Sequence, residues 1–161
     1  TLMYRSPTCT ETDREAAEHL AKIAGIDVET FSNEMFRAGS NLKNKTPEEI
    51  FLQDFKKFSA NDVTFGVGQV NVMHQEDLDD IKKRIEDYLP EAYQKQGVQM
   101  LFFMLTNIVM ERSELLCIGA NARKLIEETF EVTEHEGVYM LRGVVSRKKQ
   151  LLPALVEALQ Q

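Results

Sequence analysis

Apolar residues in the first third of the chain recur every three or four positions, which is the spacing of one face of an α-helix. Thr12 and Glu15 match a capping box and Gly25 is a natural stop, so a first helix is predicted between them. A second helix is predicted over residues 27–38. A third begins after Thr46, a cap residue that is followed by proline. Three helices in succession predict a helical arm at the start of the chain.

The hydrophobic pattern changes near Val63, where apolar residues begin to alternate with small or polar ones, as in a β-strand. The apolar positions switch parity after Val67, which predicts one long strand with a bulge around Gly66 and Gly68. Further helices are predicted over residues 76–96, 121–130 and 151–159, with strands over residues 100–105, 115–118 and 138–141 and a tight turn at Gly137. This order indicates an α/β fold, with a mixed β-sheet flanked by helices and preceded by the N-terminal helical arm.

The length of 161 residues suits one domain with an attached arm. The stretch 39–45 (GSNLKNK) is the best candidate for a flexible joint. We therefore expect a helical arm and linker over residues 1–45 and an α/β domain over residues 46–161. The chain begins at Thr1 without methionine, from which we expect a fragment of a longer protein.

Composition narrows the possible partners. The net charge of −7 argues against broad nucleic-acid binding, which needs a basic surface. The longest apolar run, residues 98–110, is interrupted by polar residues and is too short to cross a bilayer, so no membrane segment is expected. Cys9 and Cys117 are too few for a disulfide framework, and we interpret them as reduced thiols of a cytoplasmic protein.

The strongest chemical signal is a basic run over residues 142–149 (RGVVSRKK), which contains four basic residues and no acidic one. It lies where a strand gives way to a helix, and the free N–H groups of a helix start favour an anion. Arg147 offers a planar fork to two phosphate oxygens, Lys148 a mobile charge, and Ser146 a helix cap or a further hydrogen bond. A solvated basic turn on an acidic surface remains the alternative.

Other patterns are weak or missing. Lys56 and Lys57 form a second basic pair, for which a surface interpretation is favoured from the residues alone. The three histidines are far apart, and the chain contains no recognisable metal, nucleophile or Walker motif. An anion cluster without a metal ligand or a base describes half of a phosphoryl-transfer site.

Several stretches, taken together, resemble family II inorganic pyrophosphatases, the manganese- or cobalt-dependent members of the DHH phosphoesterase superfamily. The most specific stretch is residues 143–150 (GVVSRKKQ), which is similar to the C-terminal signature of that family. Residues 4–10 (YRSPTCT), 69–71 (QVN) and 105–108 (LTNI) are similar too, in the same order along the chain. The resemblance covers essentially the whole chain and identifies it as the C-terminal, DHH-associated domain.

The resemblance implies that Lys56, Arg147 and Lys148 bind pyrophosphate, with Ser146 and Lys149 as supporting contacts. It also implies a missing N-terminal DHH domain that holds Mn²⁺ (or Co²⁺) and joins two subunits into a homodimer, with Mg²⁺ as a further cofactor of the full-length parent. No metal ligand is then expected in this chain, and the fragment alone is expected to be inactive. The parent would hydrolyse diphosphate to two phosphates, using a metal-activated water.

Two other functions stay open at this point. One is an exopolyphosphatase of the same superfamily, against which the similarity of the arm argues. The other is a non-catalytic, anion-binding regulatory module. The sequence does not show whether the parent carries regulatory CBS domains.

Overall fold

The structure is a computed structural model that describes residues 4–39 and 42–160. Within them, six strands form one mixed sheet in the order β1-β2-β3-β4-β6-β5. The strands are β1 (Phe55–Ala60), β2 (Val63–Val72), β3 (Met100–Asn107), β4 (Arg112–Gly119), β5 (Glu134–His135) and β6 (Val138–Arg142). The helices are α1 (Glu11–Ala24), α2 (Val28–Gly39), α3 (Pro47–Gln53), α4 (Gln75–Gln96), α5 (Ala122–Phe130), the π-helical turn η2 (Arg147–Leu151) and α6 (Leu152–Gln160).

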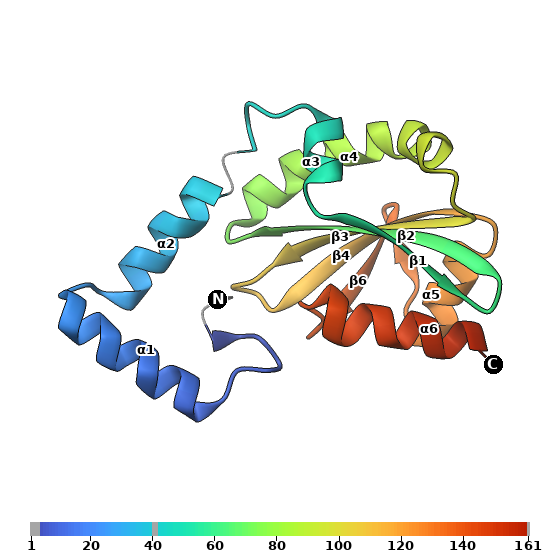
Figure 1. Cartoon of the computed structure of the whole chain (residues 1–161). Coiled ribbons are helices and arrows are strands. Elements are labelled where there is room, and N and C mark those ends of the chain that lie inside the picture. Colours follow the sequence, from blue (N-terminus) through green and yellow to red (C-terminus); the bar gives the residue numbers. More distant parts are fainter. Residues whose placement is uncertain (1–3, 40–41, 161) are drawn as a thin grey trace.

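The helices lie on both sides of the sheet, so the predicted α/β class is confirmed (Figure 1). Helices α3 and α4 cover one face, and α5 and α6 cover the other. Helices α1 and α2 extend away from the sheet as an arm. The predicted joint at residues 39–45 includes residues 40–41, which lie outside the described residues.

Capping chemistry fixes the starts of the early helices. Thr46, the predicted cap of α3, forms a capping box with Glu49, in which each side chain accepts from the other's backbone N–H. The predicted box of α1 is wrong by two residues, because Thr10 and Asp13 form it instead. Thr10 has the extended backbone that a cap residue needs, and its position starts the helix earlier than the apolar pattern suggests.

The predicted bulge in the long strand is wrong. The pairing of β2 with β3 advances residue by residue from Phe65 opposite Met100 to Val72 opposite Asn107. Both faces of β2 are covered by helices, so apolar residues occupy both parities without any break in register. Gly66 is needed for close packing, because a Cβ atom there would lie 2.4 Å from the Phe55 ring.

Strand β1 was not predicted, because its basic residues hide the alternation. It forms a hairpin with β2, and the two residues between the strands, Asn61 and Asp62, have φ values of 48° and 63°. Positive φ at both central positions is the backbone of a type I′ turn, the turn that suits a tight hairpin. The hairpin places Lys56 and Lys57 on opposite faces of the sheet edge, since successive side chains of a strand alternate.

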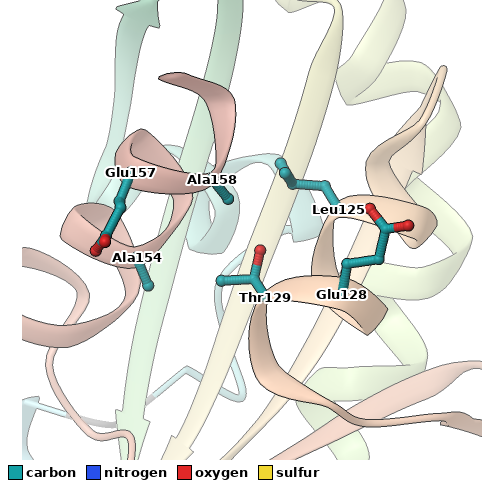
Figure 2. A pocket seen from close by; sticks show the side chains of 6 residues that line it. All are labelled: Leu125, Glu128, Thr129, Ala154, Glu157 and Ala158. Carbon is teal, nitrogen blue, oxygen red and sulfur yellow. The ribbon is translucent and has the colours of Figure 1, made fainter. Parts of the chain in front are cut away.

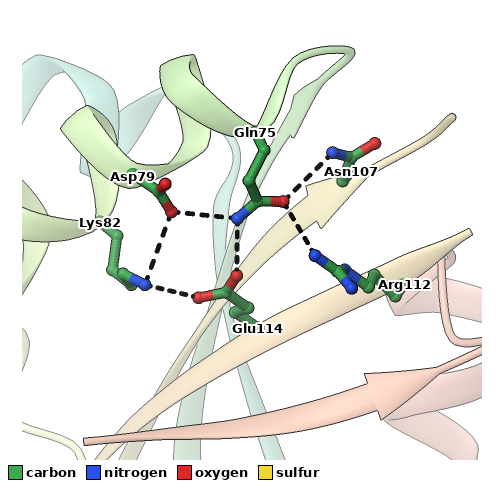
Figure 3. A network of polar contacts seen from close by, with 6 residues as sticks. All are labelled: Gln75, Asp79, Lys82, Asn107, Arg112 and Glu114. Atoms are coloured by element: carbon green, nitrogen blue, oxygen red, sulfur yellow. Dashed lines mark hydrogen bonds and ion pairs between the residues drawn. The ribbon is translucent and has the colours of Figure 1, made fainter. Parts of the chain in front are cut away.

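A buried polar network joins the start of α4 to β3 and β4 (Figure 3). Glu114 is only 4% exposed, and its two oxygens accept from Lys82 at 2.8 Å and from Gln75 at 2.9 Å. The Gln75 oxygen in turn accepts from Asn107 and from Arg112. This network fixes α4 against the edge of the sheet at which β3 ends.

Candidate functional site

Three strands of the sheet end at the same edge. Strands β2 and β3 are parallel, and β6 is parallel to both because it pairs antiparallel to β4, which is itself antiparallel to β3. Ligands of open α/β sheets bind outside the carboxyl ends of the strands. The segment that follows β6 at this edge is residues 143–146, which we call the basic-site loop, and it leads directly into η2.

Side chains from neighbouring strands hold the basic-site loop in place. The amide nitrogen of Gln69 donates to the Val145 carbonyl at 3.1 Å and lies 3.0 Å from the hydroxyl of Thr106. The Ser113 hydroxyl donates to the Val144 carbonyl at 2.6 Å. The backbone of the loop is therefore bonded to β2 and β4 by buried or half-buried side chains, and does not hang freely from the sheet.

Gln150 closes the loop from its other end. Its amide oxygen accepts from the backbone N–H groups of Val145 and Ser146, at 3.0 and 3.1 Å, and its amide nitrogen donates to the Gly143 carbonyl at 2.7 Å. Sequence reasoning assigned no role to Gln69 or Gln150. Their only signal was that each stands inside a stretch that resembles the family, QVN or SRKKQ.

Arg147 is buried, being 8% exposed, although it lies in a basic surface run. Its Nη2 donates to the Asp54 carboxylate at 2.7 Å, and its Nη1 donates to the main-chain carbonyls of Asp54 and of Val67. The guanidinium thus reaches across the sheet face to the point where β1 begins. Burial and these partners make a freely solvated basic turn a poor description of Arg147.

Lys56 approaches the same stretch of β2. It is the register partner of Val67, so its side chain shares a face with Val67, on the side covered by α6 and η2. Lys57 points to the opposite face, where its Nζ donates to the Gln96 carbonyl at 2.6 Å. Lys56 and Arg147, which are 91 positions apart in the sequence, therefore both lie on one side of β2, near Val67.

Lys148 and Lys149 are exposed, as is Lys56. Among the described residues, neither Lys56 nor Lys148 forms an ion pair or a side-chain hydrogen bond. Ser146 acts as the cap of η2, because its hydroxyl accepts from the backbone N–H of Lys149 at 3.2 Å. The site therefore combines two unpaired lysines, Lys56 and Lys148, with an arginine, Arg147, that is held by hydrogen bonds beside the N-terminal end of a helix. A π-helical turn at that end is a feature often found at functional sites.

The described residues give no support for a metal site, a reactive cysteine or a membrane-spanning helix. In the part of the chain that the structure describes, no three His, Cys, Asp or Glu side chains are grouped to hold a metal ion. Burial raises the pKa of Cys117 to about 11, which suppresses its thiolate at neutral pH. No described helix combines the length and the apolar character needed to cross a membrane.

The surface also has a groove of about 500 Å³ between α5 and α6 (Figure 2). Its charged lining side chains are Glu128 and Glu157, which would repel an anion. A second cavity, of about 300 Å³, adjoins the basic site through Asp54 and Gln69 and is lined on its other side by the end of the arm and by α3. The cationic side chains and these two cavities do not coincide.

Comparisons with known proteins give one consistent result. Residues 33–158 match the model of the DHHA2 domain family. The chain is 43% identical over 157 residues to the cobalt-dependent inorganic pyrophosphatase of Clostridium perfringens, covering 98% of the chain and 28% of that protein. It is 37% identical over 161 residues to the manganese-dependent inorganic pyrophosphatase of Bacillus subtilis, covering 98% of the chain and 51% of that protein.

A solved structure agrees with these relatives. The crystal structure of a putative family II inorganic pyrophosphatase from Methanococcus jannaschii superimposes with a TM-score of 0.85 at 37% identity. The match covers all of this chain and 52% of the archaeal one. The chain thus spans about half the length, or less, of the relatives it matches.

Proposed function

Because this chain belongs to the DHHA2 domain family, we propose that it is the substrate-binding domain of an inorganic pyrophosphatase and that Lys56, Arg147 and Lys148 bind the diphosphate. The observation that carries the proposal is the approach of Lys56 and Arg147 to the same stretch of β2, around Val67, on the face that α6 and η2 cover. The names of the relatives support diphosphate as the substrate.

Charge and geometry fit such a ligand. A diphosphate carries several negative charges on closely spaced oxygens, so it is held best by several separate donors. The planar fork of an arginine and the mobile ammonium groups of two lysines supply them. Asp54 neutralises one of the three positive charges, which leaves a net charge of about +2 at the site at neutral pH. Ser146 and Lys149 remain proposed supporting contacts.

The described residues include no group of three His, Cys, Asp or Glu side chains that could hold a metal ion. The manganese or cobalt named in the relatives would have to be held by a further part of a longer protein, which we propose is a DHH domain that also forms the homodimer. Residues 1–45 would then link the two parts. A cytoplasmic location, Mg²⁺ as a further cofactor, and the absence of nucleic-acid partners belong to the same proposal.

Calorimetry on the 161-residue chain tests this function. We expect weak pyrophosphate binding that falls further near 0.5 M salt, where the Debye length is on the order of 4 Å. Lys148→Ala should weaken binding by about tenfold, as expected for loss of one charge-assisted contact, and the Arg147→Ala/Lys148→Ala variant should abolish it. The exposed Lys83 provides the control, since Lys83→Ala should bind like the unaltered chain.

Two results would contradict the proposal. One is pyrophosphate binding that survives in the Arg147→Ala/Lys148→Ala variant. The other is tight Mn²⁺ binding by the chain itself, which would mean that the metal site is not elsewhere. A parallel titration with tripolyphosphate separates the pyrophosphatase from the exopolyphosphatase interpretation, because the latter requires the longer anion to bind more tightly.

A further inference from the structure

We propose that Asp54 is the positioning residue of the site: it fixes the orientation in which the Arg147 guanidinium meets the anion. This inference rests on the proposed function. It assigns a role to an acidic residue at a site that selects anions, where a carboxylate is otherwise unfavourable.

Asp54 offers two acceptors to one guanidinium. Its carboxylate accepts from Nη2, and its main-chain carbonyl accepts from Nη1. A guanidinium is planar, so fixing two of its three nitrogens fixes the whole plane and the directions of the N–H groups that remain. The Val67 carbonyl also accepts from Nη1 and so holds the guanidinium against β2.

Asp54 is itself held in place. It is the residue at which α3 ends, with φ −142° and ψ 56°, and its carbonyl also accepts from the backbone N–H of Gln69. Lys56 stands two positions further along the same backbone, in β1, where its side chain faces the side of β2 that Arg147 contacts. One short segment therefore positions Arg147 through Asp54 and carries Lys56 directly, so it sets the placement of both cations together.

The burial of Arg147 is a second reason for the presence of the Asp54 carboxylate. Arg147 is 8% exposed, whereas the Asp54 side chain is 49% exposed. A buried guanidinium without a carboxylate is unfavourable. The ion pair with Asp54 therefore allows Arg147 to be a buried, fixed donor and not a mobile one on the surface. The two unpaired lysines can then adapt to the ligand while Arg147 provides the fixed point.

A double-variant cycle tests the role of Asp54, with pyrophosphate affinity measured by calorimetry on the 161-residue chain. Asp54→Asn keeps an acceptor at the carboxylate position and should bind within about threefold of the unaltered chain, while Asp54→Ala should bind about tenfold more weakly. In the Arg147→Ala background, Asp54→Ala should cause no further loss, because Asp54 acts only through Arg147. A purely structural role would not produce this dependence or the recovery with asparagine.

The proposal is overturned if Asp54→Ala binds as tightly as the unaltered chain, or if it weakens binding equally with and without Arg147. Should circular dichroism show that Asp54→Ala is unfolded, Asp54→Ser takes its place in the same cycle with the same expected results, since serine is polar and too short to reach Nη2. Failure of the proposed function looks different: Lys148→Ala, which leaves the Asp54 contacts intact, would then have no effect on affinity, and the positioning role would fall with it.

Discussion

Lys56→Ala is expected to lower the kcat/KM of pyrophosphate hydrolysis about a hundredfold, in a protein that joins this chain to a metal-binding half, whereas Lys57→Ala should change it by no more than about threefold. The two lysines are adjacent and alike in charge, but they point to opposite faces. Lys56 faces the side where Arg147 contacts β2, while the Lys57 ammonium donates to the Gln96 carbonyl at the end of α4.

The pair is its own control, because both substitutions remove one exposed positive charge from the same strand. A general loss of positive charge would therefore appear equally in both variants. Steady-state kinetics of the two proteins measured side by side decides the matter. Equal losses would show that the wrong lysine has been assigned to the substrate.

Lys82→Ala is expected to lower the free energy of unfolding by about 3 kcal/mol, the cost of leaving a buried charge without its partner. The partner is Glu114, which would keep only its contact with Gln75 in the network of Figure 3. Burial on its own would lower the pKa of Lys82, but the hydrogen bond and charge of Glu114 outweigh it and raise that pKa. From neutral pH up to the ordinary lysine pKa this stabilisation should therefore be fully present, and it should be lost as the pH rises through the raised value.

Urea denaturation of the chain at neutral pH measures this effect. The neighbouring Lys83 is exposed, and Lys83→Ala should stay within about 0.5 kcal/mol of the unaltered chain. A Lys82→Met/Glu114→Leu variant should recover most of the stability, because an apolar pair of similar volume avoids the desolvation cost. If both lysine variants lose the same small amount, the buried pair contributes nothing beyond a surface contact.

The sequence predicts the helices well, because capping and periodicity are local. The cap of α3 at Thr46 and the stop of α1 at Gly25 both follow from residues next to the helix ends. Strand β1 was not predicted because it forms by pairing with β2 through a tight turn. The positive φ values of that turn cannot be read from the pattern of apolar residues. The predicted bulge is wrong because β2 is buried on both faces. Apolar residues then occupy odd and even positions alike, and a change from one to the other does not indicate a break in the strand.

The basic run was visible from composition, but its geometry was not. Arg147 and Asp54 are 93 positions apart in the sequence, and the residues around each of them give no sign of the contact. The choice of Lys56 over Lys57 came from resemblance to a family, and only the alternation of β1 gives it a physical reason. The roles of Lys56, Arg147 and Lys148 in substrate binding remain predictions, as does the division of the chain at residue 45.

The most direct test of a shared diphosphate site is a nitrogen-15 NMR titration of the 161-residue chain with pyrophosphate. If the cations of β1 and of η2 bind one ligand, the backbone signals of Lys56, Ser146, Arg147 and Lys148 should shift together along a single saturation curve. Signals of the α5–α6 groove, such as Thr129 and Ala158, should stay in place. Shifts confined to residues 146–149, with Lys56 unmoved up to saturation, would contradict the account.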